Sequence, residues 1–246
     1  MFDYNAPENC LQGKKILVTG SAAGIGRAAA ITYAKHGATV LLHGRKEKTL
    51  NPVYDEIVNA GYPEPAICPL DLEFVQPEQY EELAALVEQE FGTLDGLLNN
   101  ASILGVRSPV QSYDPSVWMK VMHVNVNASF MMTQAMLPLM QHDRPASIIL
   151  TSSSVGRKGR AHWGAYAVSK FATEGLMETL ADELSGMSQV RVNSVNPGAT
   201  KTQMRAWAYP GENPNDNPTP FDIMNLYLYL MSDDSVGTTG KQLNAQ

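Results

Sequence analysis

One stretch near the start of the chain restricts its possible folds more than any other: an apolar run, a glycine-rich turn and a helical pattern follow one another directly. The run covers residues 15–19, and the helical pattern covers residues 27–36 and stops at Gly37. Glycine lets the backbone approach a diphosphate closely, and a helix amino terminus offers it unpaired N–H groups and a partial positive charge. A tight turn without a ligand is the alternative. We predict a dinucleotide site, and its residues in this turn are Gly20, Ser21, Gly24, Ile25 and Gly26.

Apolar runs and amphipathic segments alternate along the whole chain, and such βα units require a parallel sheet covered on both faces. We therefore predict an α/β fold with one domain over residues 1–246, a doubly wound parallel sheet of about seven strands and helices on both faces, as in the Rossmann fold. The predicted strands are residues 15–19, 39–43, 66–70, 94–98, 146–151, 190–195 and 241–243. The predicted helices are residues 27–36, 46–59, 77–91, 115–140, 221–232 and a segment around Tyr166 that ends near residue 184.

One segment does not fit this alternation. Residues 203–220 contain four prolines and little periodicity. Loops of this length are uncommon unless they are lids or binding segments. We therefore predict a substrate loop around 203–220.

The residues after the second predicted strand favour a phosphorylated dinucleotide. NAD-selective sites usually place an acidic residue about 20 residues past the glycines, where it accepts hydrogen bonds from the ribose. Here Gly44 is followed by Arg45 and Lys46. A guanidinium can bind a 2′-phosphate through two parallel hydrogen bonds. We predict that NADP(H) is favoured over NAD(H) and that Arg45 contacts the 2′-phosphate of NADP(H). The alternative is that Arg45 is a solvated residue at the helix start.

Tyr166 and Lys170 are four residues apart in a helical segment, so their side chains share one face. A cation beside the phenol stabilises the phenolate and moves its pKa toward neutral pH. Ser153, thirteen residues earlier, could hold the oxygen that Tyr166 protonates. By itself this spacing is common, and a half-buried ring with a solvated amine is the alternative. Asn125 lies in an apolar helical segment, where a buried amide needs partners.

Composition limits the classes of binding partner and the cellular location that we expect for this protein. The net charge of −7 argues against nucleic acid or an anionic membrane as partner, because both need a basic surface. We see no secretory signal and no apolar segment approaching the roughly 20 residues that span a bilayer, so we expect a cytoplasmic protein. Cys10 and Cys68 lack metal-ligand spacing and are predicted to be free thiols, with no metal site.

With these elements in place, the whole chain resembles the short-chain dehydrogenase/reductase family. Within it, residues 151–160 and 169–175 are similar to the YciK-type bacterial oxidoreductases. One departure is Ser102, where the family usually has glycine and where a side chain narrows the room beside the cofactor. The resemblance is carried by Thr19, Gly20, Gly24, Gly26, Asp71, Asn99, Asn100, Ala101, Asn125, Ser153, Tyr166, Lys170, Pro197, Gly198 and Thr202.

The resemblance implies an NADP-dependent oxidoreductase that interconverts a carbonyl and an alcohol. Tyr166 would be the general acid and base, Lys170 would bind the nicotinamide ribose and lower the Tyr166 pKa, Ser153 would orient the substrate oxygen, and Asn125 would hold a water of a proton relay. Subunits would pair through the helices that contain Asn125 and Tyr166, as a homodimer or homotetramer. Besides the glycine turn and Arg45, the implied cofactor-binding residues are Asp71, Leu72, Asn100, Ala101, Tyr166, Lys170, Pro197, Gly198, Thr200 and Thr202. For Asp71 the residues leave two roles open, acceptance from the adenine amine and capping of a turn.

Two further hypotheses concern function. The first is a non-catalytic nucleotide-binding regulatory or scaffold protein of the same fold, against which the presence of all four catalytic groups argues. The second is that a basic loop between Ser153 and Tyr166 attracts a substrate with a carboxylate or phosphate; a solvated loop or a subunit contact is the alternative. The residues of this basic loop are Arg157, Lys158, Arg160 and His162.

Overall fold

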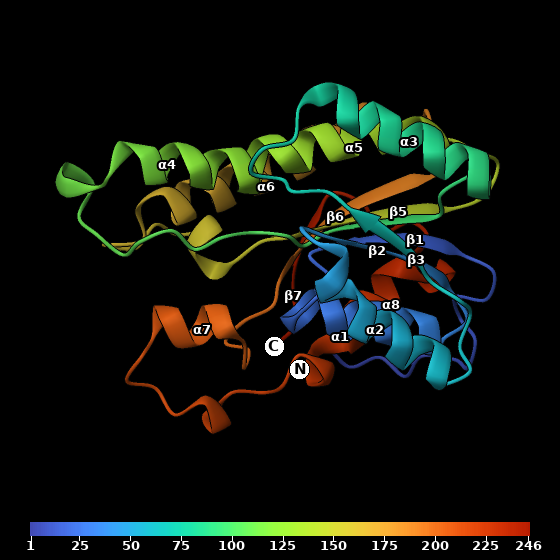
Figure 1. The fold of residues 1–246 in the computed structure, drawn as a ribbon, viewed down its shortest axis with the longest axis horizontal. Coiled ribbons are helices and arrows are strands. Elements are labelled where there is room, and N and C mark those ends of the chain that lie inside the picture. Colours follow the sequence, from blue (N-terminus) through green and yellow to red (C-terminus); the bar gives the residue numbers. More distant parts are fainter.

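The computed structural model describes residues 1–246 and contains one parallel sheet of seven strands (Figure 1). The predicted α/β fold with a single doubly wound domain is confirmed. Every neighbouring pair of strands is parallel. In sheet order the strands are β3 (Ala66–Pro69), β2 (Thr39–Gly44), β1 (Lys15–Thr19), β4 (Gly96–Asn99), β5 (Ala146–Thr151), β6 (Val190–Asn196) and β7 (Lys241–Asn244).

Helices cover both faces of this sheet, in two layers that Figure 1 shows above and below the strands. Alternate strand residues point to opposite faces, so Val18 belongs to one large buried cluster and Leu17 to the other. No helix combines the length and hydropathy needed to cross a membrane. One face carries α1 (Gly24–Lys35), α2 (Glu47–Asn59) and α8 (Met224–Met231). The other carries α3 (Pro77–Phe91), α4 (Pro115–Met122), α5 (Ala128–Met140) and α6 (Gly164–Glu183).

The order of the strands determines where a ligand can enter. The chain runs outward from β1 to β3 and then returns to β4 on the other side of β1. At such a switch point the connections leave in opposite directions, so a crevice opens at the carboxyl ends of the strands. The glycine turn after β1 lies at this edge.

The predicted helix over residues 115–140 is confirmed, but it is not α-helical throughout. The five residues His123–Asn127 form a π-helical turn between α4 and α5. A π turn widens the helix and is common at functional sites. Here it contains Asn125, whose side chain bonds two segments outside the helix, so those hydrogen bonds stabilise the irregular turn.

The predicted loop over residues 203–220 is wrong at its start, where α7 (Gln203–Ala208) forms a short helix. The Thr202 hydroxyl accepts a hydrogen bond from the Arg205 N–H at 3.2 Å and caps it, as side-chain oxygens do at helix starts. Between Tyr209 and Pro220 the chain has no regular structure except for one 3-10 turn, Pro214–Asp216. Figure 1 shows α7 standing apart from both helical layers.

His43 near the end of β2 is a polar group in the core. Its side chain is buried, and neither ring nitrogen has a hydrogen-bond partner. Burial disfavours the charged imidazolium and lowers the pKa of His43 from 6.5 to about 4. The folded protein therefore keeps this ring neutral at mildly acidic pH.

We predict that the free energy of unfolding falls as pH is lowered from 6.5 to about 4, because the unfolded chain binds a proton that the folded protein excludes. Above this window both states are neutral and the stability is fully present. The total loss attributable to this residue is roughly 3 kcal/mol. Denaturant titrations of the wild type and His43→Leu across this pH window measure it. An identical pH dependence in the two proteins would contradict the prediction.

Candidate active site

Tyr166 and Lys170 lie one turn apart on α6, and both side chains are buried. The Lys170 ammonium donates a hydrogen bond of 2.7 Å to the carbonyl of Thr151, the last residue of β5. It also lies 5.6 Å from the centroid of the Tyr166 ring. Ser153 lies two residues after the end of β5 and caps a 3-10 turn. The predicted pair therefore faces the carboxyl end of the sheet, beside the predicted serine.

Asn125 is joined to this helix by hydrogen bonds. Its Nδ2 donates to Ser169 Oγ on α6 at 3.0 Å and to the Ile103 carbonyl at 2.9 Å, while its Oδ1 accepts from the Ile103 N–H at 2.8 Å. Ser169 in turn donates to the Tyr166 carbonyl. The buried amide thus has the partners it needs, and it connects the loop after β4 to the Tyr166 helix.

Burial dominates the protonation of both titratable groups. It raises the pKa of Tyr166 to about 12, while an interaction with the Ser153 hydroxyl acts in the opposite direction. It lowers the pKa of Lys170 to about 8, while the negative charge of Glu174 raises it. The pKa of Tyr166 is therefore raised and not lowered as the sequence predicted, because desolvation of the phenolate outweighs the interaction with Ser153. At neutral pH the phenol keeps its proton and the amine remains mostly charged.

The glycine turn has the close backbone packing that a diphosphate cradle needs. A Cβ at Gly26 would lie 2.2 Å from the Gly20 carbonyl oxygen, so only glycine allows α1 to start there. Gly20 and Gly24 have φ angles of 69° and 57°, the left-handed region that favours glycine. No side chain caps the start of α1 at Ala23. Its first N–H groups and partial positive charge therefore suit a phosphate group.

Thr19 at the end of β1 joins this turn to the loop after β4. Its hydroxyl accepts hydrogen bonds from the N–H groups of Asn100 and Ala101, at 2.9 and 3.0 Å. Asn100 Nδ2 donates to the Thr19 carbonyl at 3.1 Å. The Ser21 hydroxyl donates to the His43 carbonyl at 3.1 Å. These bonds hold the carboxyl ends of β1, β2 and β4 in one rigid edge.

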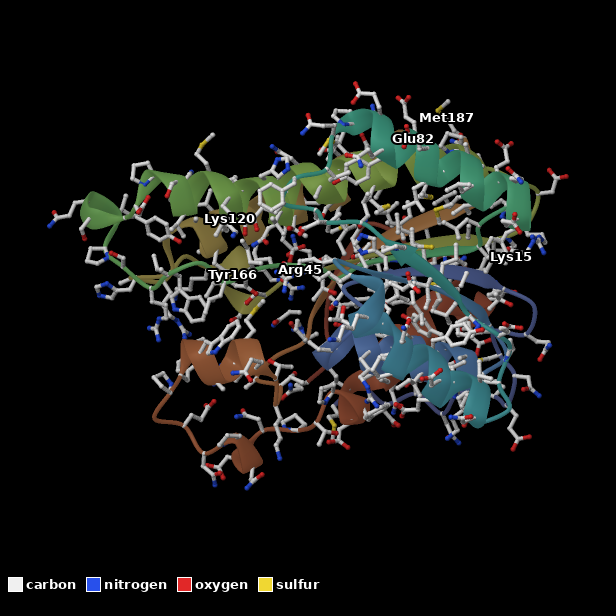
Figure 2. All side chains as sticks on the ribbon, in the orientation of Figure 1. Lys15, Arg45, Glu82, Lys120, Tyr166 and Met187 are labelled. Carbon is white, nitrogen blue, oxygen red and sulfur yellow. The ribbon has the colours of Figure 1, made fainter.

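The residues predicted to contact the adenosine half lie at the same edge. Arg45 follows β2, is exposed and forms no ion pair. Figure 2 shows Arg45 and Tyr166 away from Lys15, which marks the amino end of β1. Asp71 Oδ1 accepts from the Glu73 N–H at 3.2 Å, so this carboxylate caps a turn, one of its two open roles. Leu72 is buried in the core beneath it.

The segment after β6 is brought against the glycine turn. A Cβ on Gly24 would meet the Thr202 methyl at 3.5 Å, although the two residues are far apart in sequence. Gly198 has a φ of 73°. The side chain of the terminal Gln246 donates to the Pro197 carbonyl at 2.7 Å and to the Ala199 carbonyl at 3.1 Å. A residue at the chain end therefore holds this segment in place.

The predicted site residues gather at one edge of the sheet, but several of their partners were not found from sequence. These partners act through backbone carbonyls or contacts distant in sequence, which leave no local pattern. The Glu174 carboxylate had one usable signal, its place one turn after Lys170 on the same helical face. The partners that the prediction missed are Ile103, Thr151, Ser169, Glu174 and Gln246.

The basic loop is only partly available to a substrate. The Arg157 guanidinium forms an ion pair of 3.1 Å with the buried Glu174 carboxylate and donates to Asn244 and the Leu243 carbonyl of β7. Glu174 also accepts from the Ser194 hydroxyl. Arg157 therefore fastens the loop to the C-terminal strand, and the hypothesis that it meets the substrate is wrong for this residue.

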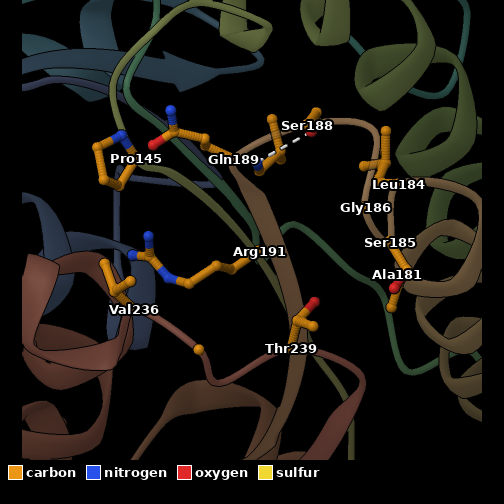
Figure 3. Close-up of a pocket in the computed structure, with 12 residues that line it drawn as sticks. Pro145, Ala181, Leu184, Ser185, Gly186, Ser188, Gln189, Arg191, Val236 and Thr239 are labelled. Atoms are coloured by element: carbon orange, nitrogen blue, oxygen red, sulfur yellow. Dashed lines mark hydrogen bonds between the residues drawn. The ribbon is translucent and has the colours of Figure 1, made fainter.

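A pocket of about 220 Å³ lies away from these groups (Figure 3). Its lining includes Pro145 before β5 and Val190 and Arg191 at the start of β6. The pocket thus faces the amino edge of the sheet, opposite to Tyr166. It does not belong to the candidate active site.

The comparison with known families agrees with this site. Residues 14–213 match the profile of the short chain dehydrogenase family. The match covers most of the chain and includes the glycine turn, Tyr166 and Lys170. The protein therefore belongs to the short-chain dehydrogenase/reductase family.

Individual relatives narrow this class, and the resemblance to YciK-type oxidoreductases is confirmed. The chain is 50% identical to the uncharacterized oxidoreductase YciK of Escherichia coli K12 over 243 residues, 99% of this chain and 96% of that one. A short chain dehydrogenase from Pseudomonas syringae has a structure with a TM-score of 0.99 and 62% identity, covering 100% of both chains. A short chain dehydrogenase from E. coli CFT073, crystallised with NADPH, has a TM-score of 0.95 and 51% identity over 98% of this chain and 100% of that one.

The Arg157–Glu174 ion pair leads to a prediction about stability. We expect Glu174→Leu to lower the free energy of unfolding by about 3 kcal/mol, because it leaves a largely buried guanidinium without its partner. Chemical denaturation monitored by circular dichroism measures this loss. The double variant Arg157→Leu, Glu174→Leu should recover part of it, since the unpaired guanidinium is gone while the buried Lys170 ammonium still lacks the charge of Glu174. Equal stability of Glu174→Leu and the wild type would show that the pair contributes nothing.

Proposed function

We propose that this protein is an NADPH-linked reductase that interconverts a carbonyl and an alcohol by hydride transfer. The observation that carries the proposal is the convergence of four groups at the carboxyl edge of the sheet. Tyr166 and Lys170 share one helical face, Ser153 begins the turn beside them, and Asn125 is bonded to the same helix. A nucleotide-binding protein without turnover does not need this arrangement.

The chain's own residues can carry out the proton chemistry. Tyr166 retains its proton at neutral pH, since burial raises its pKa to about 12, and it can donate that proton to a substrate oxygen. The Ser153 hydroxyl would orient this oxygen and share its hydrogen bond. Lys170 would bind the nicotinamide ribose, for which its ammonium needs to remain charged. Bound NADPH would supply the hydride, while the protein supplies position and electrostatics.

Several observations support NADP(H) as the cofactor. The glycine turn and the uncapped start of α1 suit a diphosphate. The exposed guanidinium of Arg45 follows β2, where an NAD-selective site usually has an acidic residue. Relatives from Shigella flexneri and E. coli were crystallised with NADP and NADPH, respectively. Pro197, Gly198 and Thr200 would lie on the nicotinamide side, because they follow β6 beside the catalytic helix.

The proposal also includes the oligomeric state and the cellular location of the protein. Large apolar side chains are exposed on the helices that contain or adjoin the site, which supports a homodimer or homotetramer formed through these helices. They are Met119 on α4, Phe130 on α5, and Val168 and Phe171 on α6. Cys10 and Cys68 are free thiols, which fits the reducing cytoplasm. The substrate would be a small molecule that enters beside α7 and the segment after it.

Replacing Tyr166 with phenylalanine tests the catalytic assignment. The variant keeps the ring but loses the proton donor, so we expect turnover to fall by at least about 10²-fold. The affinity for NADPH should stay within about threefold of the wild type, since the phenol makes a small part of that contact. Nicotinamide absorbance with a panel of aldehydes, ketones and alcohols measures turnover, and fluorescence titration measures binding. Turnover equal to that of the wild type would refute the role of Tyr166.

Replacing Arg45 with alanine tests the cofactor preference. We expect the Kd of NADPH to rise by about 10- to 100-fold, the loss of one or two charge-assisted hydrogen bonds. The Kd of NADH should change by less than about threefold, because NADH has no 2′-phosphate. Lys35→Ala is a matched control, since it removes an exposed positive charge at the far end of α1. If Arg45→Ala weakened both nucleotides equally, the residue would not select NADPH.

A further inference from the structure

Three arginines from separate segments surround one tyrosine, Tyr209, just after α7. The Arg205 guanidinium stacks on its ring with the Cζ atom 3.8 Å from the centroid. The Arg107 guanidinium lies between two rings, 5.3 Å from that of Tyr209 and 5.1 Å from that of Trp163. Arg160 donates a hydrogen bond of 3.0 Å to the Tyr209 hydroxyl. We call these five residues the arginine–aromatic cluster.

The cluster has more positive charge than its acidic neighbours balance. Its one carboxylate partner is Glu212, which accepts two hydrogen bonds of 2.6 Å from Arg205. Arg107 and Arg160 form no ion pair. Like charges that share neighbours repel each other, and here they do so in a protein with a net charge of −7. The contacts with aromatic faces lower this cost but leave two positive charges uncompensated.

The cluster lies beside the catalytic tyrosine. The Trp163 ring centroid is 5.7 Å from that of Tyr166. Trp163 and Tyr166 belong to one small buried cluster together with Leu104 and Ala208. The three arginines come from the loop after β4, the basic loop and the region around α7. These three segments therefore meet at Trp163 and Tyr209, and Trp163 packs against Tyr166.

One buried donor in the cluster lacks a partner. Trp163 is 7% exposed, and its indole Nε1 has no hydrogen-bond partner. A buried N–H without a partner is costly, and a ligand or a water can satisfy it. The Arg107 and Arg160 side chains are exposed at the same place, so solvent reaches the guanidinium groups.

We infer that the substrate of this site carries an anionic group, a carboxylate or a phosphate, which Arg107 and Arg160 bind while Tyr166 acts on the carbonyl. A guanidinium group can donate two parallel hydrogen bonds to a pair of oxygens of either anion. The inference rests on the proposed function for the place of the reacting carbonyl, but the anion site itself follows from the cluster. From the sequence, Arg157 was expected to attract the anionic group. The inference gives this role to Arg107 instead, a residue that no sequence pattern indicated.

Ligand binding tests this inference without requiring turnover. The probes are benzoate, phenyl phosphate and benzamide, three ligands with one phenyl ring each, of which the last is neutral and similar in shape to benzoate. Their dissociation constants are measured by calorimetry with the full-length protein, alone and in the presence of NADP⁺. We expect one of the two anions to bind at least about tenfold more tightly than benzamide, and the difference to shrink as salt rises. Equal binding of all three ligands would overturn the inference, and the preferred anion distinguishes a carboxylate from a phosphate site.

Variants locate the site. In Arg107→Met, Arg160→Met the preference for the anion should disappear while the affinity for benzamide stays the same, a result that a purely structural role would not give. The control Lys35→Met, Lys241→Met removes two exposed positive charges elsewhere and should keep the preference. Arg107→Lys, which retains the charge, should retain part of the preference. A preference that survives in Arg107→Met, Arg160→Met, or disappears equally in the control, would overturn the inference.

Turnover separates this inference from the proposed function. Under saturating NADPH, kcat/KM is compared for 4-carboxybenzaldehyde and its neutral methyl ester. If kcat/KM is higher for the carboxylate than for the ester in the wild type, and this difference is lost in Arg107→Met, Arg160→Met, the result supports both the anion site and the reductase activity. No oxidation of NADPH by either aldehyde, together with tight binding of benzoate or phenyl phosphate, would support the anion site and count against the reductase.

Discussion

The candidate active site depends on how the protein keeps one lysine charged in its interior. Lys170 is almost fully buried, and an ammonium in that position is costly unless other groups compensate it. The Thr151 carbonyl accepts a hydrogen bond of 2.7 Å from it, and Glu174 lies one turn further along the same helix. Because Thr151 ends β5, the same bond docks α6 on the sheet. Tyr166 and Ser153 are neighbours as a result.

The second constraint is close backbone packing around the glycine turn. The start of α1 touches the Gly20 carbonyl so closely that Gly26 cannot be replaced by a larger residue without movement. Thr19 then uses its hydroxyl to hold the loop after β4 against the turn. The proposed dinucleotide crevice is therefore formed by backbone atoms whose positions are already determined by the sheet. Little rearrangement is needed for a diphosphate to bind there, which favours affinity.

Residues beyond this rigid edge differ in how firmly they are held. Arg157 is bound to Glu174 and to β7, so the basic loop has a fixed base. The tip of the loop is not bound to the sheet. There Arg160 donates a hydrogen bond to the Tyr209 hydroxyl, just after α7. The proposed chemistry would thus lie on the sheet and on α6, whereas the groups that would recognise a substrate come from three connecting segments. Such a division lets one fold serve many substrates, since loops can change without disturbing the proton donor.

The sequence alone determined the sheet, the glycine turn and the pair formed by Tyr166 and Lys170, because each leaves a local pattern of spacing or periodicity. It also placed Asn125 correctly as a buried amide with partners. It could not show the π turn that orients this amide, since that turn depends on hydrogen bonds to Ile103 and Ser169. The direction in which the Tyr166 pKa shifts was likewise decided by the tertiary structure, because desolvation depends on which side chains cover the ring. For the same reason, only the folded protein could show that Arg157 is a structural residue: Glu174, its partner, is seventeen residues away in sequence and adjacent only after α6 packs on the sheet.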